Sequence, residues 1–90
     1  MRKELRQEIE LKLYSYSSLK DAQWGRLIGK VLEELPDQMR QLACMRYIER
    51  QSEREICSSL HIERAAYYNW VNRIINEVAI AAAYERLIEP

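Results

Sequence analysis

Apolar residues recur at helical spacing along most of this chain, and few residues interrupt the pattern. The most regular stretch has apolar residues at i, i+3, i+4, i+7, i+8 and i+11: Trp24, Leu27, Ile28, Val31, Leu32 and Leu35. Only two glycines and two prolines occur in the 90 residues. Because an all-β domain needs many turns, the sequence predicts an all-α fold of about five helices, with roughly two thirds or more of the residues helical.

Polar residues and one proline divide this pattern into separate helices. Ser18 and Asp21 indicate the start of the second helix, and Pro36 indicates the start of the third. Ser52 and Glu55 have the spacing of a capping box, in which each side chain accepts a hydrogen bond from the other residue's backbone amide. We expect helices over residues 2–17, 18–35, 36–49 and 52–60, and a last helix of about 25 residues from residue 63 or 64. Residues at three-residue steps of the third helix are expected to point inward: Met39, Leu42, Met45 and Ile48.

The sequence offers no sign of export, a membrane span or a metal site. Its N-terminus, MRKELRQEIE, has no apolar segment typical of a signal peptide, and no apolar run approaches the roughly 20 residues of a membrane helix. Cys44 and Cys57 lie in apolar helical patterns, so we expect two buried structural thiols rather than a disulfide or a zinc pair. We therefore expect a cytoplasmic protein without a metal or other cofactor.

Residues 52–60, the tight connection 61–63 and the helix from Arg64 onward have the order of a helix-turn-helix. One face of the last helix is apolar and can pack on Ile56, Cys57 and Leu60; it carries Ala66, Tyr67, Trp70, Val71 and Ile74. We expect a single domain over residues 1–90, with an N-terminal helical hairpin (1–35) and a helix-turn-helix module with an extended recognition helix (36–90).

The other face of the last helix has the groups that base readout needs: planar amides, a guanidinium, a phenol and a small residue that allows close approach. It is centred on Ala65, Tyr68, Asn69, Asn72 and Asn76, with Arg64 at its margin. We expect double-stranded DNA to contact six residues: Arg54, Arg64, Ala65, Tyr68, Asn69 and Asn72. The alternative for Arg64 and Asn69 is an ordinary solvated face. A stacking platform for single strands is the alternative for Tyr67 and Trp70, but their position on the apolar face favours the core.

The stretch from Leu35 to Trp70 resembles region 4 of sigma-70-type factors. The matches agree with that pattern in order and spacing: Leu35-Pro36, Met45-Arg46-Tyr47, Ser52, Glu55-Ile56-Cys57, Leu60 and Ile62. The Tyr-Tyr-Asn-Trp sequence that ends the stretch, together with the small size, is similar to phage late-gene activators of the RinA and ArpU type. The resemblance implies a phage-type transcription activator that binds promoter or operator DNA and acts with bacterial RNA polymerase.

The resemblance also assigns roles to individual residues. Arg64 and Asn69 match positions that read bases in sigma factors, and Tyr68 matches a position that contacts the DNA backbone. Ala65 stands where an acidic base-reading residue often occurs, so the sequence preference of sigma factors is not expected to transfer. His61 replaces the usual glycine, and Glu63 replaces the usual serine or threonine cap. Residues 1–34 do not resemble region 2, so a complete sigma factor is not expected.

The charge balance favours an alternative function. Net charge is zero, with ten basic and eight acidic side chains in residues 1–50 and four and six in residues 51–90. Because phosphate attraction supplies most non-specific affinity, a neutral domain should bind DNA weakly by itself. The alternatives are action as a homodimer, and an interaction module that binds RNA polymerase or a sigma factor without reading DNA.

Two further features bear on these alternatives. An apolar stripe on the distal part of the last helix must be covered by the N-terminal helices or by another chain: Val78, Ala81, Tyr84 and Ile88. No catalytic arrangement is recognisable, because Ser58 and Ser59 have no base arranged beside them and His61 is expected in the turn. We therefore expect a protein that is not an enzyme.

Overall fold

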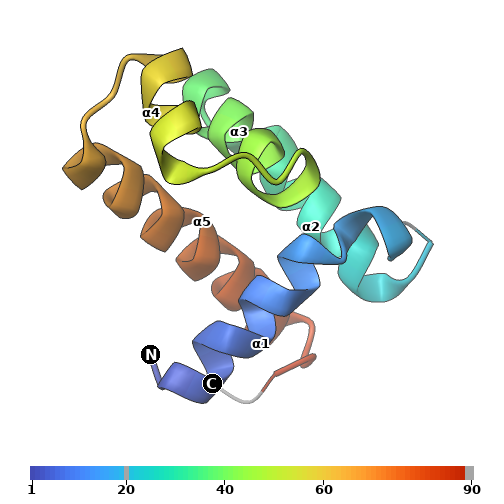
Figure 1. Ribbon diagram of the computed structural model, residues 1–90. Coiled ribbons are helices and arrows are strands. Elements are labelled where there is room, and N and C mark those ends of the chain that lie inside the picture. The colour runs from blue at the N-terminus through green and yellow to red at the C-terminus, as the bar shows by residue number, and fades with distance from the viewer. Residues whose placement is uncertain (20, 89–90) are drawn as a thin grey trace.

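The computed structural model describes residues 1–19 and 21–88, and it confirms the all-α prediction. Helices hold 78% of these residues, and no strand occurs among them. The described residues form five α-helices, one 3₁₀ turn and one π-helical segment (Figure 1). In chain order they are α1 (Lys3–Tyr14), η1 (Tyr16–Ser18), α2 (Gln23–Glu34), α3 (Asp37–Ala43), η2 (Cys44–Ile48), α4 (Glu53–Leu60) and α5 (Arg64–Tyr84).

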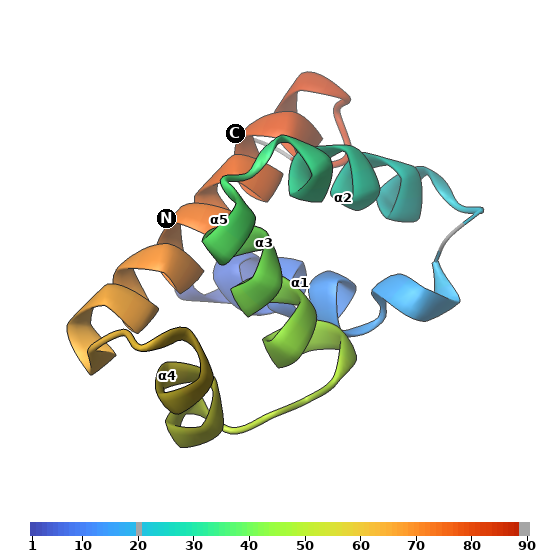
Figure 2. The same cartoon turned by 90° about the horizontal axis from the view of Figure 1, so that it is seen from above.

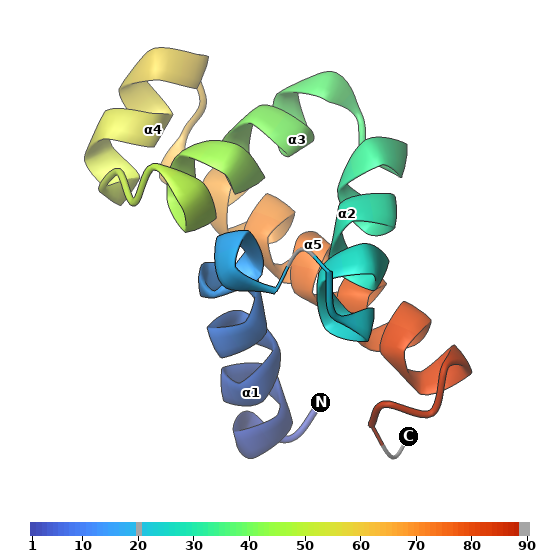
Figure 3. The ribbon, with the colours of Figure 1, turned by 90° about the vertical axis from the view of Figure 1, so that its right-hand side faces the viewer.

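The long helix α5 contacts each of the other four α-helices. Helix α3 lies between α2 and α4 in all three views (Figures 1, 2 and 3). Buried side chains of α5 lie in one cluster with those of the other helices, such as Ile9 and Leu13 of α1, Ile28 of α2 and Ile56 of α4. One core therefore joins residues 1–35 to α4 and α5.

The boundary between the first two helices differs from the sequence prediction. Helix α1 ends at Tyr14, and Ser18 lies in the 3₁₀ turn η1 rather than at the start of a helix. Helix α2 begins at Gln23 after Ala22, whose backbone N–H donates to the carbonyl of Leu19 at 2.9 Å. The expected cap from Ser18 and Asp21 was wrong, because successive tight turns already satisfy the backbone in this segment.

The third helix contains a π-helical segment that changes which residues point inward. Met39 and Leu42 are buried as predicted, and Met45 is half-buried. Ile48, however, is 42% exposed, and its neighbour Tyr47 is buried instead. The backbone N–H of Glu49 donates to the carbonyl of Cys44 at 3.0 Å, five residues back. A hydrogen bond over five residues instead of four inserts one extra residue into the turn. The residues after it therefore face a different side of the helix from the one that regular α-helical spacing predicts.

Helix α5 is shorter than predicted, because it ends at Tyr84 after 21 residues. Arg86 has a positive φ of 59°. Its backbone N–H donates to the carbonyl of Ala83 at 3.1 Å, and the N–H of Leu87 donates to that of Ala82 at 2.9 Å. This is a Schellman ending, and it turns the chain away from the helix axis.

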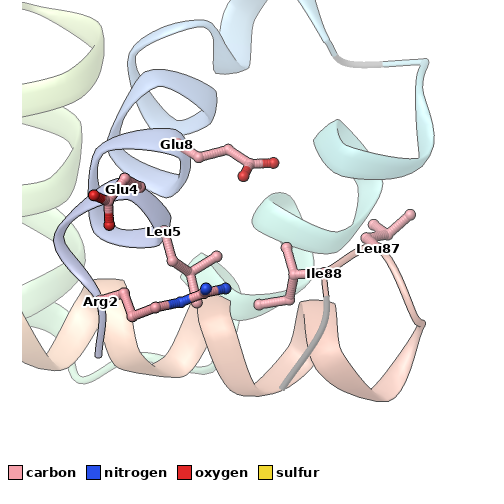
Figure 4. A pocket seen from close by; sticks show the side chains of 6 residues that line it. All are labelled: Arg2, Glu4, Leu5, Glu8, Leu87 and Ile88. Atoms are coloured by element: carbon pink, nitrogen blue, oxygen red, sulfur yellow. The ribbon is translucent and has the colours of Figure 1, made fainter.

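The N-terminal helices cover most of the distal apolar stripe of α5. Val78 is fully buried, Ala81 and Ile88 are half-buried, and both α1 and α2 pack on α5. Figure 4 shows Leu5 of α1 and Ile88 lining the same shallow pocket. Tyr84 is the exception, since 86% of its surface is exposed. The chain itself therefore covers the stripe, apart from Tyr84.

Both cysteines are free thiols, and they are half-buried, so they are less buried than expected. Across residues 1–19 and 21–88, no group of three His, Cys, Asp or Glu side chains could hold a metal ion. None of the helices in this part of the chain has the length and apolar character needed to cross a membrane.

Candidate nucleic-acid interface

Helix α4 starts at a capping box, as the sequence predicts. The backbone N–H of Glu55 donates to Ser52 Oγ at 3.1 Å, and the N–H of Ser52 donates to Glu55 Oε1 at 2.9 Å. The hydrogen bond from the Ser52 backbone is the largest cause that lowers the pKa of Glu55. These bonds fix the first turn of α4, which starts with Glu53 and Arg54.

The connection between α4 and α5 is a tight left-handed turn. His61 has φ 54° and ψ 47°, and the N–H of Ile62 donates to the carbonyl of Cys57 at 3.1 Å. Ile62 is half-buried and packs against the core. Glu63 is the N-cap residue of α5, and its side chain makes no capping hydrogen bond within the described residues. The turn therefore sets the direction of α5 through the backbone.

The packed face of α5 holds most of the expected residues. Tyr67, Val71 and Ile74 are buried as predicted, with Tyr67 only 1% exposed. Ala66 and Trp70 are half-buried, so the expectation that they lie fully in the core was too strong. The hydroxyl of Tyr67 accepts a hydrogen bond from Arg46 Nη1. Burial on this scale excludes Tyr67 as a stacking surface for single strands.

All six residues expected to contact DNA are exposed: Arg54, Arg64, Ala65, Tyr68, Asn69 and Asn72. Arg64 lies over the ring of Tyr68, with the guanidinium carbon 5.6 Å from the ring centroid. Arg54 of α4 lines the same shallow depression as Arg64. Asn69 and Asn72 follow along the exposed face of α5. Arg54 and Arg64 therefore come together from the two helices, and the asparagines extend the same polar face.

The sequence did not predict that the carboxylate of Glu53 contacts Arg64 and Tyr68 on this exposed face. Glu53 Oε1 lies 3.0 Å from Arg64 Nε, and Tyr68 Oη donates to Glu53 Oε2 at 3.2 Å. Tyr68 first, and then Glu53, raise the pKa of Arg64. Acidic residues are common in the first turn of a helix, so nothing in the sequence indicates that Glu53 belongs to the site. We call Glu53, Arg64 and Tyr68 the carboxylate cluster.

A second cluster, centred on Arg46, packs against the buried face of α5. Arg46 of η2 forms an ion pair with Glu10 of α1, with Nη2 and Oε2 3.1 Å apart. Tyr47 Oη donates to the same carboxylate at 3.0 Å. The guanidinium carbon of Arg46 lies 5.3–5.8 Å from the ring centroids of Tyr14, Tyr47 and Tyr67. Burial alone would lower the pKa of Arg46, but Tyr47 and Glu10 outweigh it and raise that pKa. Arg46 and Tyr47, which belong to the match with sigma region 4, thus connect η2 with α1 and α5.

A model of a family described as "Protein of unknown function (DUF1492)" matches residues 5–79. The chain belongs to the DUF1492 family. The part of this DUF1492 protein that matches runs from within α1 to Ala79 in α5, so it includes most of α1, all of α2, α3 and α4, and most of α5. No curated protein and no solved structure matches the chain.

Proposed function

We propose that this protein binds double-stranded DNA sequence-specifically, with the first turns of α5 in the major groove. The observation that carries the proposal is the division of α5 into two faces. Tyr67, Val71 and Ile74 anchor one face in the core, while Arg64, Asn69 and their neighbours are exposed on the other. An arginine can pair with guanine and an asparagine with adenine through two hydrogen bonds each.

The proposed role is that of a transcription regulator of the phage activator type, which acts with bacterial RNA polymerase. This finer assignment rests on the resemblance of residues 35–70 to sigma region 4. Acidic residues lie close to the proposed interface, among them Glu53, Glu55 and Glu63. They weaken the attraction to phosphates, so selectivity has to come from base contacts, and added affinity from RNA polymerase or a second copy of the chain.

The alternative is an interaction module that docks on RNA polymerase or a sigma factor without reading DNA. Zero net charge supports this alternative. So does the exposure of Ile80 and Tyr84, which lie one turn apart on α5 beyond the polar residues. Large exposed apolar side chains are typical of surfaces that contact another protein.

Selection of bound duplexes from random DNA, followed by affinity measurements at several salt concentrations, separates the two functions. We expect an enriched motif and an affinity that falls steeply with salt, because each phosphate contact releases counterions. Two half-sites in the motif would indicate a dimer. A protein that enriches no motif, and whose binding to RNA polymerase does not depend on DNA, would support docking instead.

Two substitutions then test the reader residues. Arg64→Ala and Asn69→Ala should each reduce discrimination at one or two base pairs by about tenfold or more, because each loses a two-bond base contact. Both side chains are exposed, so the fold should be unchanged. Lys30→Ala, which removes a charge from the exposed surface of α2, is the control and should leave the base preference intact. If Arg64→Ala and Asn69→Ala keep the affinity and base preference of the unsubstituted protein, α5 is not the reader.

A further inference from the structure

The carboxylate of Glu53 contacts two of the residues that are proposed to meet DNA. One oxygen lies 3.0 Å from Arg64 Nε, and the other accepts a hydrogen bond from Tyr68 at 3.2 Å. Glu53 belongs to α4, whereas Arg64 and Tyr68 occupy the first and second turns of α5. One side chain of α4 therefore contacts two side chains of the proposed reading helix α5, through an ion pair with Arg64 and a hydrogen bond from Tyr68.

The geometry leaves Arg64 able to bind while it is held. Its ion pair with Glu53 runs through Nε rather than through the terminal nitrogens, and its side chain is still 77% exposed. The terminal nitrogens can meet a base edge while Nε stays on the carboxylate. A long side chain held in its binding conformation loses less conformational entropy when the complex forms.

The charge of Glu53 acts in a second way. A carboxylate at the protein–DNA interface repels phosphates on every duplex, whatever its sequence. A correct base offsets this repulsion because it bonds the prearranged guanidinium, whereas a wrong base does not. Repulsion and prearrangement therefore both widen the difference in affinity between the right and the wrong sequence.

We propose that Glu53 is a specificity-determining residue of the DNA interface, which positions Arg64 for one base and weakens binding to sequences that lack it. This inference rests on the proposed function. The simpler role, an acid that stabilises the N-terminus of α4, requires no contact with Arg64 or Tyr68 and predicts no effect on base preference.

The test compares Glu53→Gln with Glu63→Gln. Glu63 is exposed, adjoins Arg64 in sequence, and makes no side-chain capping bond within the described part of the chain, so its substitution removes the same charge without touching the cluster. Affinities are measured for the selected duplex, its single-base variants and a scrambled duplex. We expect both substitutions to tighten binding to the scrambled duplex, but only Glu53→Gln to lower discrimination at the Arg64 base pair, by roughly five- to tenfold.

Two further variants separate positioning from charge. Glu53→Asp keeps the charge but shortens the side chain, so it should lose discrimination without tighter binding to the scrambled duplex. In an Arg64→Ala background, Glu53→Gln should no longer change discrimination. Equal discrimination in Glu53→Gln and Glu63→Gln, in a protein that does select a motif, overturns the role of Glu53 alone. Absence of any selected motif overturns the proposed function and this inference together.

Discussion

The backbone of His61 is left-handed, with φ 54°, at the point where α4 ends. Arg50 and Arg86, which lie two residues beyond the ends of η2 and α5, have φ values of 55° and 59°. A residue with a Cβ atom is strained in this region of backbone conformation, and glycine is not. The region 4 pattern has glycine where this chain has His61. The left-handed backbone of His61 therefore lowers the stability of the fold at the turn that sets the direction of α5.

His61→Gly should therefore stabilise the protein. We expect the free energy of unfolding to rise by about 0.5–1 kcal/mol, measured by urea denaturation, because the strain of the left-handed residue is relieved. Ser59→Gly, at an exposed position inside α4, is the matched control and should lower stability by about 0.5–1 kcal/mol. Equal losses for both substitutions would show that residue 61 is not strained.

The raised pKa of Tyr47 predicts how the free energy of unfolding depends on pH. Burial first, and then the nearby Glu10 carboxylate, raise the pKa of Tyr47 above its ordinary value of 10.0. Because the folded protein holds this proton more tightly than the unfolded chain, the stability that it contributes is complete below pH 10 and is lost as the pH rises further. The free energy of unfolding should fall above pH 10, by up to about 1.4 kcal/mol per pH unit for one such group.

Tyr47→Phe should reduce this alkaline slope, as measured by urea denaturation between pH 8 and 11. It should also lower stability at neutral pH by about 1 kcal/mol, because the hydrogen bond to Glu10 is lost. Tyr84→Phe alters an exposed tyrosine and should leave the slope unchanged. An identical slope in Tyr47→Phe and the unsubstituted protein would show that Tyr47 does not contribute.

At the scale of elements, the π-helical segment η2 decides which residues of the third helix are buried. Its wider turn brings Arg46 and Tyr47 to Glu10 and leaves Ile48 exposed. Ile48→Ser should change the free energy of unfolding by no more than about 0.5 kcal/mol. Leu42→Ala, one element earlier and fully buried, should cost about 2–5 kcal/mol. A large loss for Ile48→Ser would indicate a regular α-helical register instead.

Some features of the helices could be predicted from the sequence, and others could not. The number of helices, the capping box at Ser52 and the core face of α5 follow local rules of periodicity and hydrogen bonding, and these predictions were confirmed. The π-helical turn could not be predicted, because one extra residue in a turn leaves no mark on a short apolar pattern. The end of α5 was missed because Arg86, rather than a glycine, adopts the left-handed conformation.

The candidate site was predictable only in part, for a physical reason. Exposure of Arg64 and Asn69 follows from which face of α5 is apolar. The contact of Glu53 with Arg64 depends on how α4 and α5 cross, and a sequence pattern does not specify that crossing. The half-burial of Trp70 has the same origin, because the neighbours of a side chain at the edge of a core are set by tertiary packing.

For the whole molecule, one core joins the N-terminal helices to α5, the helix that is proposed to read DNA. Helices α1 and α2 pack on α5, and the ion pair between Glu10 and Arg46 lies beside Tyr67. The cluster around Arg46 therefore fixes the buried face of the helix whose other face is proposed to read DNA. Substitutions that loosen this cluster should weaken binding to all duplexes alike, whereas those at Arg64 should change the base preference.

An NMR titration with DNA tests the proposed binding site over the whole molecule. Isotope-labelled protein is titrated with a duplex from the selection, and the changes in the NMR signals of all backbone amides and of the asparagine and arginine side chains are recorded. If the first turns of α5 read the bases, the largest changes should lie in residues 53–72, including the side-chain amides of Asn69 and Asn72, and few should lie on α1. Changes that cluster on α1 or α2, while residues 64–72 keep their free-state signals, would contradict DNA reading by α5.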